Sequence, residues 1–188
     1  MNPTQIASGP DGGQGGGAPA RVPPGEALYN DVLDFLHAEA ELLDEGRLID
    51  WLGMLSEEIS YRMPVRATLS RDEGPGFAEG VTLFDDSLGT LTLRVKRIVE
   101  SPNAHSEMPA TRSRRFVTNV RVESNGADVL VRSSLLLLCS RWDVDAFDFM
   151  AARRNDVMRR SGGSLKLARR EILMDQRVPQ SAYLSVFL

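Results

Sequence analysis

Two turn signals divide the C-terminal half of the chain into long strands. Asn125-Gly126 is a two-residue hairpin signal, and Ser161-Gly162-Gly163-Ser164 places a Gly-Gly pair between two further segments. Because Asn-Gly and Gly-Gly pairs adopt the backbone angles of tight hairpin turns, each signal predicts two antiparallel strands joined directly. We therefore expect the region from about residue 113 onward to be mostly strand.

The first turn predicts the register of its two strands. With Asn125-Gly126 at its centre, one face of the hairpin is apolar, and Asn119, Arg121 and Arg132 lie on the other. The expected facing pairs on the apolar face are Val122 with Val129, Val120 with Val131, Thr118 with Ser133, and Phe116 with Leu135.

The second turn predicts ion pairs across its strands. With Gly162-Gly163 at its centre, Arg154 lies opposite Glu171, and Asp156 lies opposite Arg169. Two such pairs, each worth about 0.2 to 1 kcal/mol, are typical of a sheet face that is partly solvated. The arginines of these strands would then serve the sheet and not a phosphate group.

The N-terminal half carries helical patterns. A helix is predicted from Glu26 to Gly46, because its apolar residues follow the i, i+3, i+4, i+7 spacing and its carboxylates lie on the other face. These apolar residues are Leu28, Val32, Phe35, Leu36, Leu42 and Leu43. A second short helix has Leu48, Trp51, Leu52 and Leu55 on one side.

The segment between the helices and the hairpins is less regular. Ile59, Tyr61, Met63 and Val65 alternate as in a strand, in which Pro64 implies a bulge or an edge position. Residues 70–83 are rich in glycine and are expected to form a loop. Residues 84–99 fit either a strand or a helix, and we favour a helix capped by Asp85 or Asp86.

These elements predict an α+β fold in which N-terminal helices pack on one side of a long, twisted antiparallel sheet. Residues 1–25 are rich in Gly and Pro and poor in large apolar side chains, so they are expected to form a flexible arm. Residues 26–188 are expected to form a single domain around one core.

Composition excludes several classes of function. The net charge of -4 and the pI of about 5.3 argue against binding to nucleic acid. The longest apolar run, Leu135 to Cys139, is far shorter than the roughly 18 residues of a membrane span, and no secretory signal is visible. We expect a cytoplasmic protein without a membrane partner. The single cysteine, Cys139, lies in that apolar run and is interpreted as part of the core.

Potential metal ligands are scarce. The chain has two histidines, His37 and His105, and one cysteine. A Rieske cluster needs two of each, other iron-sulfur clusters need four cysteines, and structural zinc sites fail the same count. A two-histidine, one-carboxylate iron site would need both histidines, and nothing in the sequence brings them together. The chain is therefore predicted to hold no metal and no cofactor.

Catalytic motifs are equally scarce, and no nucleophile, phosphate-binding or dinucleotide-binding motif occurs. His37 and Glu41 are spaced i, i+4 on one helix, which suits acid-base chemistry but more often gives a surface hydrogen bond. Asp85-Asp86 and Glu57-Glu58 need no role beyond capping or solvation. A free-standing isomerase-like or dehydratase-like enzyme that uses an internal pocket remains the alternative to a non-catalytic subunit.

Several ordered blocks resemble one family. The blocks RSRRFVTNVRV, AARRNDVMRR-SGG-SLKLARREILMDQ and YLSVFL are similar to the small (beta) subunit of the aromatic-ring-hydroxylating dioxygenases. The N-terminal segment FLHAEAELLDEGRLIDWLGMLSEEISYRMPVR is similar to the opening helices and first strand of the same family. The resemblance spans about residues 27–188. It departs from the family pattern at His105, in place of a tryptophan-containing loop, and at Leu165, in place of another tryptophan.

The resemblance implies a cone-shaped, cystatin-like fold shared with nuclear transport factor 2 and ketosteroid isomerase. It implies a structural subunit, with three small subunits forming a trimer beneath three large (alpha) subunits in a hetero-hexamer. The large subunit would hold the Rieske 2Fe-2S cluster and the mononuclear Fe(II). Electrons from NADH would arrive through a reductase and a ferredoxin, and the complex would add O2 to an aromatic ring, giving a cis-dihydrodiol in aromatic catabolism.

Three arginines fall within the matching RxRxF block. Arg112, Arg114 and Arg115 are candidate partner-binding residues, because guanidinium groups suit carboxylates at subunit interfaces. The alternative is a role within the chain, at the start of the strand.

Overall fold

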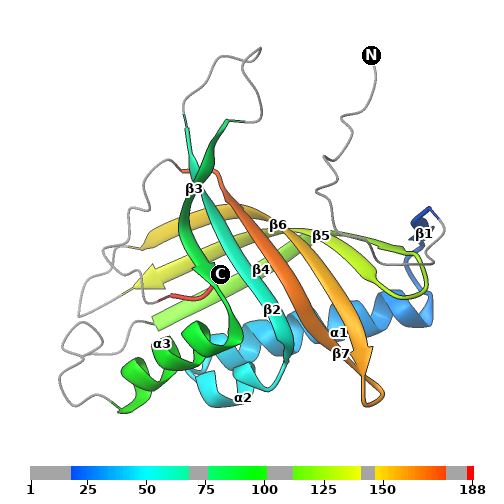
Figure 1. The fold of residues 1–188 in the computed structure, drawn as a ribbon, viewed down its shortest axis with the longest axis horizontal. Helices are drawn as coiled ribbons and strands as arrows, with labels where there is room; N and C mark the ends of the chain where they lie inside the picture. Colours follow the sequence, from blue (N-terminus) through cyan, green and yellow to red (C-terminus); the bar gives the residue numbers. More distant parts are fainter. Residues whose placement is uncertain (1–17, 68–75, 101–111, 141–146, 177–185) are drawn as a thin grey trace.

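The computed structural model describes residues 18–67, 76–100, 112–140, 147–176 and 186–188. Within these ranges, seven strands form one sheet in the order β1-β4-β5-β6-β7-β2-β3, and three helices, α1 to α3, lie along one side of it (Figure 1). Neighbouring strands are antiparallel except β2 and β7, which are parallel. The expected α+β class is confirmed, with a mixed sheet in place of a purely antiparallel one.

Helix α1 spans Ala27–Asp44; of the predicted apolar stripe, Leu28 and Leu42 are partly buried and the other four residues are buried. It is followed by the short helix α2, Leu48–Leu52, in which Leu48 and Trp51 are buried. One buried residue of α1 is charged: Glu39 is only 1% exposed, although the carboxylates were expected on the solvent face. Glu39 falls within the same helical stripe as Phe35, Leu36 and Leu43, so the helix geometry directs it inward.

Strand β2 spans Leu55–Arg66 and alternates as predicted, with Ile59, Tyr61 and Met63 buried. The register of β2 against strand β3 shifts on both sides of Pro64. This confirms the predicted bulge, which places the proline, lacking an N–H group, where the ladder is interrupted.

Strand β3 spans Phe77–Asp86, so the expectation of a loop is wrong for residues 77–83, while residues 70–75 lie outside the described residues. Glycine content suggested the loop, but the alternation of Val81 and Leu83 with Thr82 and Phe84 pairs the segment with β2. Helix α3, Leu88–Glu100, confirms the helical interpretation of residues 84–99. Its cap is Ser87 and neither aspartate, because Ser87 N–H bonds to Thr90 Oγ1 and Thr90 N–H bonds to Ser87 Oγ.

Strand β1, Ala20–Val22, lies within the segment that composition assigned to a flexible arm. It pairs antiparallel with the end of strand β4, so that Val22 lies opposite Val122 and becomes part of the core. The ordered sheet therefore begins before the helices.

The first hairpin differs from its predicted register. Strands β4, Arg112–Ser124, and β5, Val129–Ser140, place Val122 opposite Val131, and not opposite Val129. The turn is centred on Gly126 and Ala127, because the side-chain oxygen of Asn125 accepts hydrogen bonds from the backbone N–H groups of Ala127 and Asp128. Asn125 thus closes the turn through its side chain.

A bulge in β4 then changes which residues face inward. The register shifts between Thr118 and Arg121, where Asn119 adopts a left-handed φ of 54°. Beyond this point Arg115 pairs with Leu137 and is buried, whereas Phe116 pairs with Leu136 and is exposed. The expectation that Phe116 faces Leu135 in the core is therefore wrong, because one inserted residue reverses the faces of a strand.

The second hairpin also contains a bulge. Strands β6, Asp148–Ser161, and β7, Ser164–Met174, follow the predicted register near the turn, with Arg160 opposite Leu165. After a shift between Val157 and Met158, Asp156 lies opposite Arg170, and Asn155 lies opposite Glu171. The predicted pairs Arg154 with Glu171 and Asp156 with Arg169 are therefore wrong by one position.

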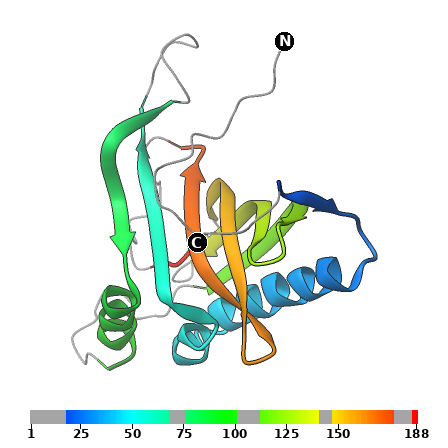
Figure 2. The same ribbon diagram turned by 45° about the vertical axis from the view of Figure 1, so that its right-hand side comes forward.

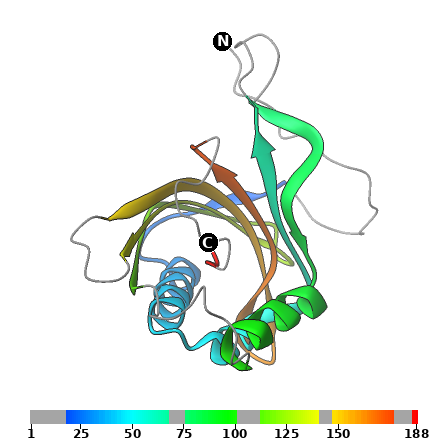
Figure 3. The same cartoon turned by 90° about the vertical axis from the view of Figure 1, so that its left-hand side faces the viewer.

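The sheet curls strongly around α1. In Figure 2, α1 crosses beneath the strands, and Figure 3 shows the sheet bending round α1 and the C-terminal residues. The inner face of this curl contains the main core, to which residues from α1, α2, α3 and the strands contribute. The curl creates an enclosed interior in which buried polar side chains from distant segments meet.

Candidate functional site inside the curled sheet

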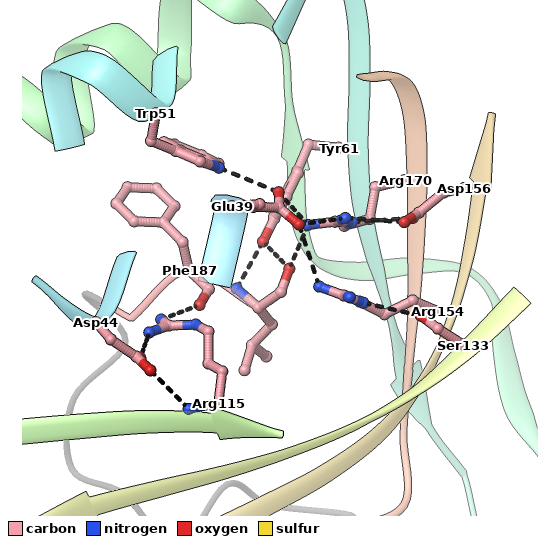
Figure 4. Close-up of polar contacts among 11 residues, drawn as sticks. Glu39, Asp44, Trp51, Tyr61, Arg115, Ser133, Arg154, Asp156, Arg170 and Phe187 are labelled. Atoms are coloured by element: carbon pink, nitrogen blue, oxygen red, sulfur yellow. Dashed lines mark hydrogen bonds and ion pairs between the residues drawn. The ribbon is translucent and has the colours of Figure 1, made fainter. Parts of the chain in front are cut away.

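Four charged side chains meet inside the sheet (Figure 4). Glu39 of α1 accepts hydrogen bonds from Arg170 of β7, at 2.7 Å to Oε1 and 2.8 Å to Oε2. Arg170 also donates from Nε and Nη2 to the two oxygens of Asp156, at 2.9 and 2.8 Å. Arg170 is therefore clamped between two carboxylates, with two hydrogen bonds to each.

Arg154 of β6 is the fourth charge. Its Nη1 donates to Glu39 Oε2 at 3.4 Å, and its Nε donates to Ser133 Oγ at 3.3 Å. Its Nη2 is buried and has no hydrogen-bond partner among the described residues. The two arginines and two carboxylates balance in charge, which is the condition for keeping such groups away from water.

Two aromatic side chains complete the network. Trp51 Nε1 donates to Glu39 Oε1 at 3.2 Å. The Tyr61 hydroxyl donates to the main-chain oxygen of Leu188 at 2.6 Å and accepts from the Leu188 N–H at 2.7 Å. Arg170 Nη1 donates to the same oxygen of Leu188 at 3.2 Å. The polar ends of both aromatic residues are thus satisfied inside the core.

The environment shifts the pKa values of these groups. Burial favours the neutral form of Glu39, but the charges of Arg170 and Arg154, with hydrogen bonds from Arg170 and Trp51, outweigh it and lower its pKa. Burial also opposes the charge of Arg170, but Asp156 and Glu39 raise its pKa well above the ordinary value. Burial, with repulsion from Arg170, lowers the pKa of Arg154, and burial raises the pKa of Tyr61.

The network around Glu39 suits a structural role better than a catalytic one. Each oxygen of Glu39 already accepts two hydrogen bonds from the chain, so neither is positioned to take a proton from a substrate. Phe187 packs against Trp51, with ring centroids 4.5 Å apart, and occupies the space beside the network. Phe187 therefore fills the space beside Glu39, and both oxygens of Glu39 are occupied within the chain.

A second ion pair joins α1 to β4. Arg115 Nη1 lies 2.5 Å from Asp44 Oδ1, and the Arg115 backbone N–H donates to Asp44 Oδ2 at 2.9 Å. Arg115 Nη2 donates to the carbonyl oxygen of Phe187 at 2.6 Å. Asp44 therefore covers a backbone group of β4 at the same time as it neutralises a buried arginine.

The structure separates the three arginines proposed from sequence. Arg115 is buried, and its guanidinium group is bound within the chain. Arg114 is exposed on β4, and Arg112 is exposed and donates from Nε to Ser140 Oγ at 3.2 Å. Their role at a subunit interface stays a prediction.

The other candidate residues are His37, Glu41, His105 and Cys139. His37 and Glu41 are exposed on α1 and line a surface hollow of about 500 Å³ between α1 and β4. His105 lies outside the described residues. Cys139 is buried, and burial raises the pKa of its thiol, as expected for a core residue. Among the residues that the structure describes, no group of three or more His, Cys, Asp or Glu side chains is placed to hold a metal ion.

Sequence reasoning missed the network around Glu39. The signal was present at Glu39, which occupies an inward position of the α1 stripe. The partners Asp156 and Arg170 were misplaced by the bulge in the second hairpin, so their common partner was not recognised.

The outer face of the sheet carries an exposed apolar patch. Phe116, Leu136 and Phe149 are 48%, 39% and 50% exposed, and we call these three residues the outer patch. Phe116 lies opposite Leu136, while Arg114 and Phe149 both lie opposite Leu138, so the patch and Arg114 share one face of β4, β5 and β6. No described helix is both long and apolar enough for a membrane span.

Comparisons with known proteins agree with one another. The sequence profile of the family described as the ring hydroxylating beta subunit matches residues 38–181. The biphenyl 2,3-dioxygenase subunit beta of Rhodococcus jostii (strain RHA1) is 33% identical over 177 residues, covering 90% of this chain and 92% of that one. The benzene 1,2-dioxygenase subunit beta of Pseudomonas putida is 34% identical over 178 residues, with the same coverage.

Solved structures show the same similarity. A chain of naphthalene 1,2-dioxygenase with indole bound in the active site superposes with a TM-score of 0.76 and 26% identity, covering 86% of each chain. The beta subunit of benzoate 1,2-dioxygenase from Burkholderia mallei gives a TM-score of 0.67 at 20% identity, covering 84% of this chain and 96% of that one. The second similarity concerns the fold alone.

Proposed function

Because the chain belongs to the family of ring-hydroxylating dioxygenase beta subunits, we propose that it acts as a non-catalytic subunit that supports the assembly of an iron-bearing large subunit. The chain is part of an oxidoreductase complex, and its partner in that complex is a large (alpha) subunit. The proposed reaction of the complex adds O2 to an aromatic ring.

One observation carries the non-catalytic role. Inside the sheet, each oxygen of Glu39 accepts two hydrogen bonds from the chain. A general base or acid needs a free position directed at a substrate, and this network offers none at Glu39. The same observation argues against a free-standing isomerase-like or dehydratase-like enzyme.

The proposal assigns the cofactors to the partner. The large subunit would hold a Rieske 2Fe-2S cluster and a mononuclear Fe(II), with NADH as the electron source through a reductase and a ferredoxin. We further propose three small and three large subunits in the complex, located in the cytoplasm. In this chain, residues 26–188 would act as one domain, because Phe187 and Leu188 bond to residues of β2, β4 and β7.

The relatives suggest the class of substrate. The similar proteins are named for biphenyl, benzene and naphthalene, which are aromatic hydrocarbons. We propose that the complex containing this chain oxidises a substrate of this class. The choice among such substrates would belong to the pocket of the large subunit.

The outer face of the sheet offers the proposed contact surface. The outer patch exposes three large apolar side chains beside Arg114, and Arg112 lies two positions further along the same strand. Apolar residues with arginine at their rim are typical of protein interfaces. We propose that Arg112 and Arg114 contact carboxylates of a neighbouring subunit, while Arg115 holds β4 to α1 from within.

Reconstitution tests the proposed role. The purified chain should contain no stoichiometric iron and should convert no aromatic hydrocarbon alone. On mixing with its large subunit, ferredoxin, reductase and NADH, it should form a complex with restored O2 uptake and dihydrodiol formation. The large subunit without this chain is the control. Stoichiometric iron in the isolated chain, or turnover by it alone, would overturn the proposal.

A further inference from the structure

An open hollow of about 420 Å³ lies where strands β1, β4, β5 and β6 adjoin. Four exposed arginines line it, one from each strand: Arg21, Arg121, Arg132 and Arg153. We call the hollow with these four residues the arginine hollow. Small-molecule sites have volumes of roughly 300 to 1,000 Å³, so the arginine hollow is large enough for a small ligand.

The pairing of the strands brings three of these arginines to one face of the sheet. Arg121 of β4 lies directly opposite Arg132 of β5, and Arg153 of β6 lies opposite Ser134 of β5. Arg132 and Ser134 are two positions apart on the same strand, so their side chains point to the same side. The guanidinium groups therefore converge on one region of the outer face.

The arginine hollow is not neutralised within the described part of the chain. Arg132 Nη2 donates to Glu123 Oε1 at 3.0 Å, and Glu123 is the one acidic residue among the described residues that line the hollow. No ion pair between described residues includes Arg21, Arg121 or Arg153. Four arginines against one carboxylate leave three positive charges unbalanced, in a chain whose net charge is -4.

Two features that cost stability coincide at the arginine hollow. Like charges directly opposite each other in a ladder, as Arg121 and Arg132 are, destabilise a sheet. Asn119, which also lines the hollow, has the left-handed φ of 54°. Strained backbone of this kind is concentrated at binding sites, and a bound anion would offset the repulsion between the two arginines.

A buried hydroxyl group adds a further polar group to the wall. Ser133 is only 2% exposed and lines the hollow. Its oxygen accepts from Arg154 Nε at 3.3 Å, and its O–H group donates to no described residue. The hydroxyl therefore retains a donor that a ligand oxygen can use.

We propose that the arginine hollow binds a small anion that carries two or more phosphate or carboxylate groups. Guanidinium groups bind both kinds of group through paired N–H donors. More than one group is needed because β1 and β6 are separated by β4 and β5, which places the origins of Arg21 and Arg153 about 14 Å apart. The proposal does not depend on the role of the chain in assembly, so its test uses the full-length chain alone.

The test offers two probes, pyrophosphate and citrate, to the wild-type chain. At least one of them should bind saturably, at one site per chain, with a Kd of about 1 mM or tighter in calorimetry. The experiment is done at an ionic strength of about 0.05 M, and the affinity should fall as salt is added. Acetate, which has a single carboxylate, should bind at least about tenfold more weakly at the same ionic strength. The tighter probe identifies phosphate or carboxylate as the preferred group.

Matched variants separate the arginine hollow from the net charge of the chain. Arg121→Gln with Arg153→Gln should raise the Kd of the tighter probe at least about tenfold. Arg97→Gln with Arg169→Gln changes the net charge equally at two exposed residues outside the hollow, and should alter the Kd less than about twofold. If the first double variant does not fold, Arg153→Gln alone should raise the Kd at least about threefold.

Three outcomes would overturn the proposal. The first is no saturable binding of either probe to the wild-type chain up to about 10 mM. The second is an equal loss of affinity in the two double variants, which would reduce the effect to net charge. The third is an absence of probe binding together with weakened assembly of Arg121→Gln with Arg153→Gln on the large subunit, which would assign the arginines to a subunit interface.

Discussion

At the scale of single residues, the four charges inside the sheet differ from surface ion pairs in what their removal costs. Glu39 is 1% exposed and neutralises two arginines at once. Loss of one partner leaves a charge buried without compensation, which costs about 3 to 5 kcal/mol, whereas an exposed pair contributes about 0 to 1 kcal/mol. The charges visible on the surface of this chain are therefore not the ones that control its stability.

Replacing Glu39 by glutamine should lower the free energy of unfolding by about 3 to 5 kcal/mol at pH 7. Glutamine keeps the shape of the side chain but leaves Arg154 and Arg170 with Asp156 as their nearest carboxylate. Urea unfolding followed by circular dichroism measures the change. Glu57→Gln, on the exposed face of β2, is the matched control and should change stability by less than about 0.5 kcal/mol.

The difference in the free energy of unfolding between the wild type and Glu39→Gln should depend on pH. The pKa of Glu39 is lowered below its ordinary value of 4.5 in the folded chain, so its stabilising contribution is complete above pH 4.5. It is lost as the pH falls through the lower pKa of the folded state. We expect a constant difference between about pH 5 and 7 that shrinks below 4.5. A difference independent of pH down to 3 would contradict the ionised state of Glu39.

At the scale of elements, two bulges determine which side chains meet. The bulge at Asn119 turns Arg115 inward and Phe116 outward, and the bulge beside Met158 brings Asp156 opposite Arg170. The hairpins, the helices and the alternation of β2 were predictable, because they depend on local periodicity and turn residues. The bulges were not, because an inserted residue leaves the local pattern intact and changes only the pairing between strands.

Asn119→Val should lower the free energy of unfolding by about 1 to 3 kcal/mol. Asn119 has a φ of 54°, a conformation that asparagine tolerates and that a β-branched side chain strongly disfavours. Its neighbour Thr118 lies in the regular ladder opposite Ser134 and is exposed, so Thr118→Val is the control and should be close to neutral. Equal stability of the two variants in urea would show that the bulge does not depend on the left-handed residue.

At the scale of the whole molecule, the curled sheet encloses a buried charge network within its apolar core and carries an apolar patch on its outer face. The class of fold followed from the order of helices and hairpins, and the family followed from ordered blocks of sequence. The charge network in the interior could not be predicted from the sequence, because Glu39 and Arg170 are 131 residues apart and meet only through the curl of the sheet. The outer patch was not predicted from the sequence either, because Phe116 was assigned to the wrong face of β4.

Phe116→Asp should weaken assembly with the large subunit while leaving the fold of the chain unchanged. A buried carboxylate without a partner opposes burial of the outer patch, so we expect the apparent Kd of the complex to rise at least about tenfold. Leu93→Asp, at a large apolar residue of α3 that is 67% exposed, is the control outside the outer patch. Size-exclusion chromatography with the large subunit measures both. Unchanged assembly of Phe116→Asp would exclude the outer patch from that interface.

The parallel pairing of β2 with β7 joins two segments that are synthesised at well separated times. Translation adds about 5 to 20 residues per second, so Glu39 leaves the ribosome on the order of ten seconds before its partner Arg170 exists. During that interval the apolar stripe of α1 and the inner face of β2 lack the strand that closes the core around them. The core around α1 therefore cannot close until residues as far as Arg170 have been synthesised.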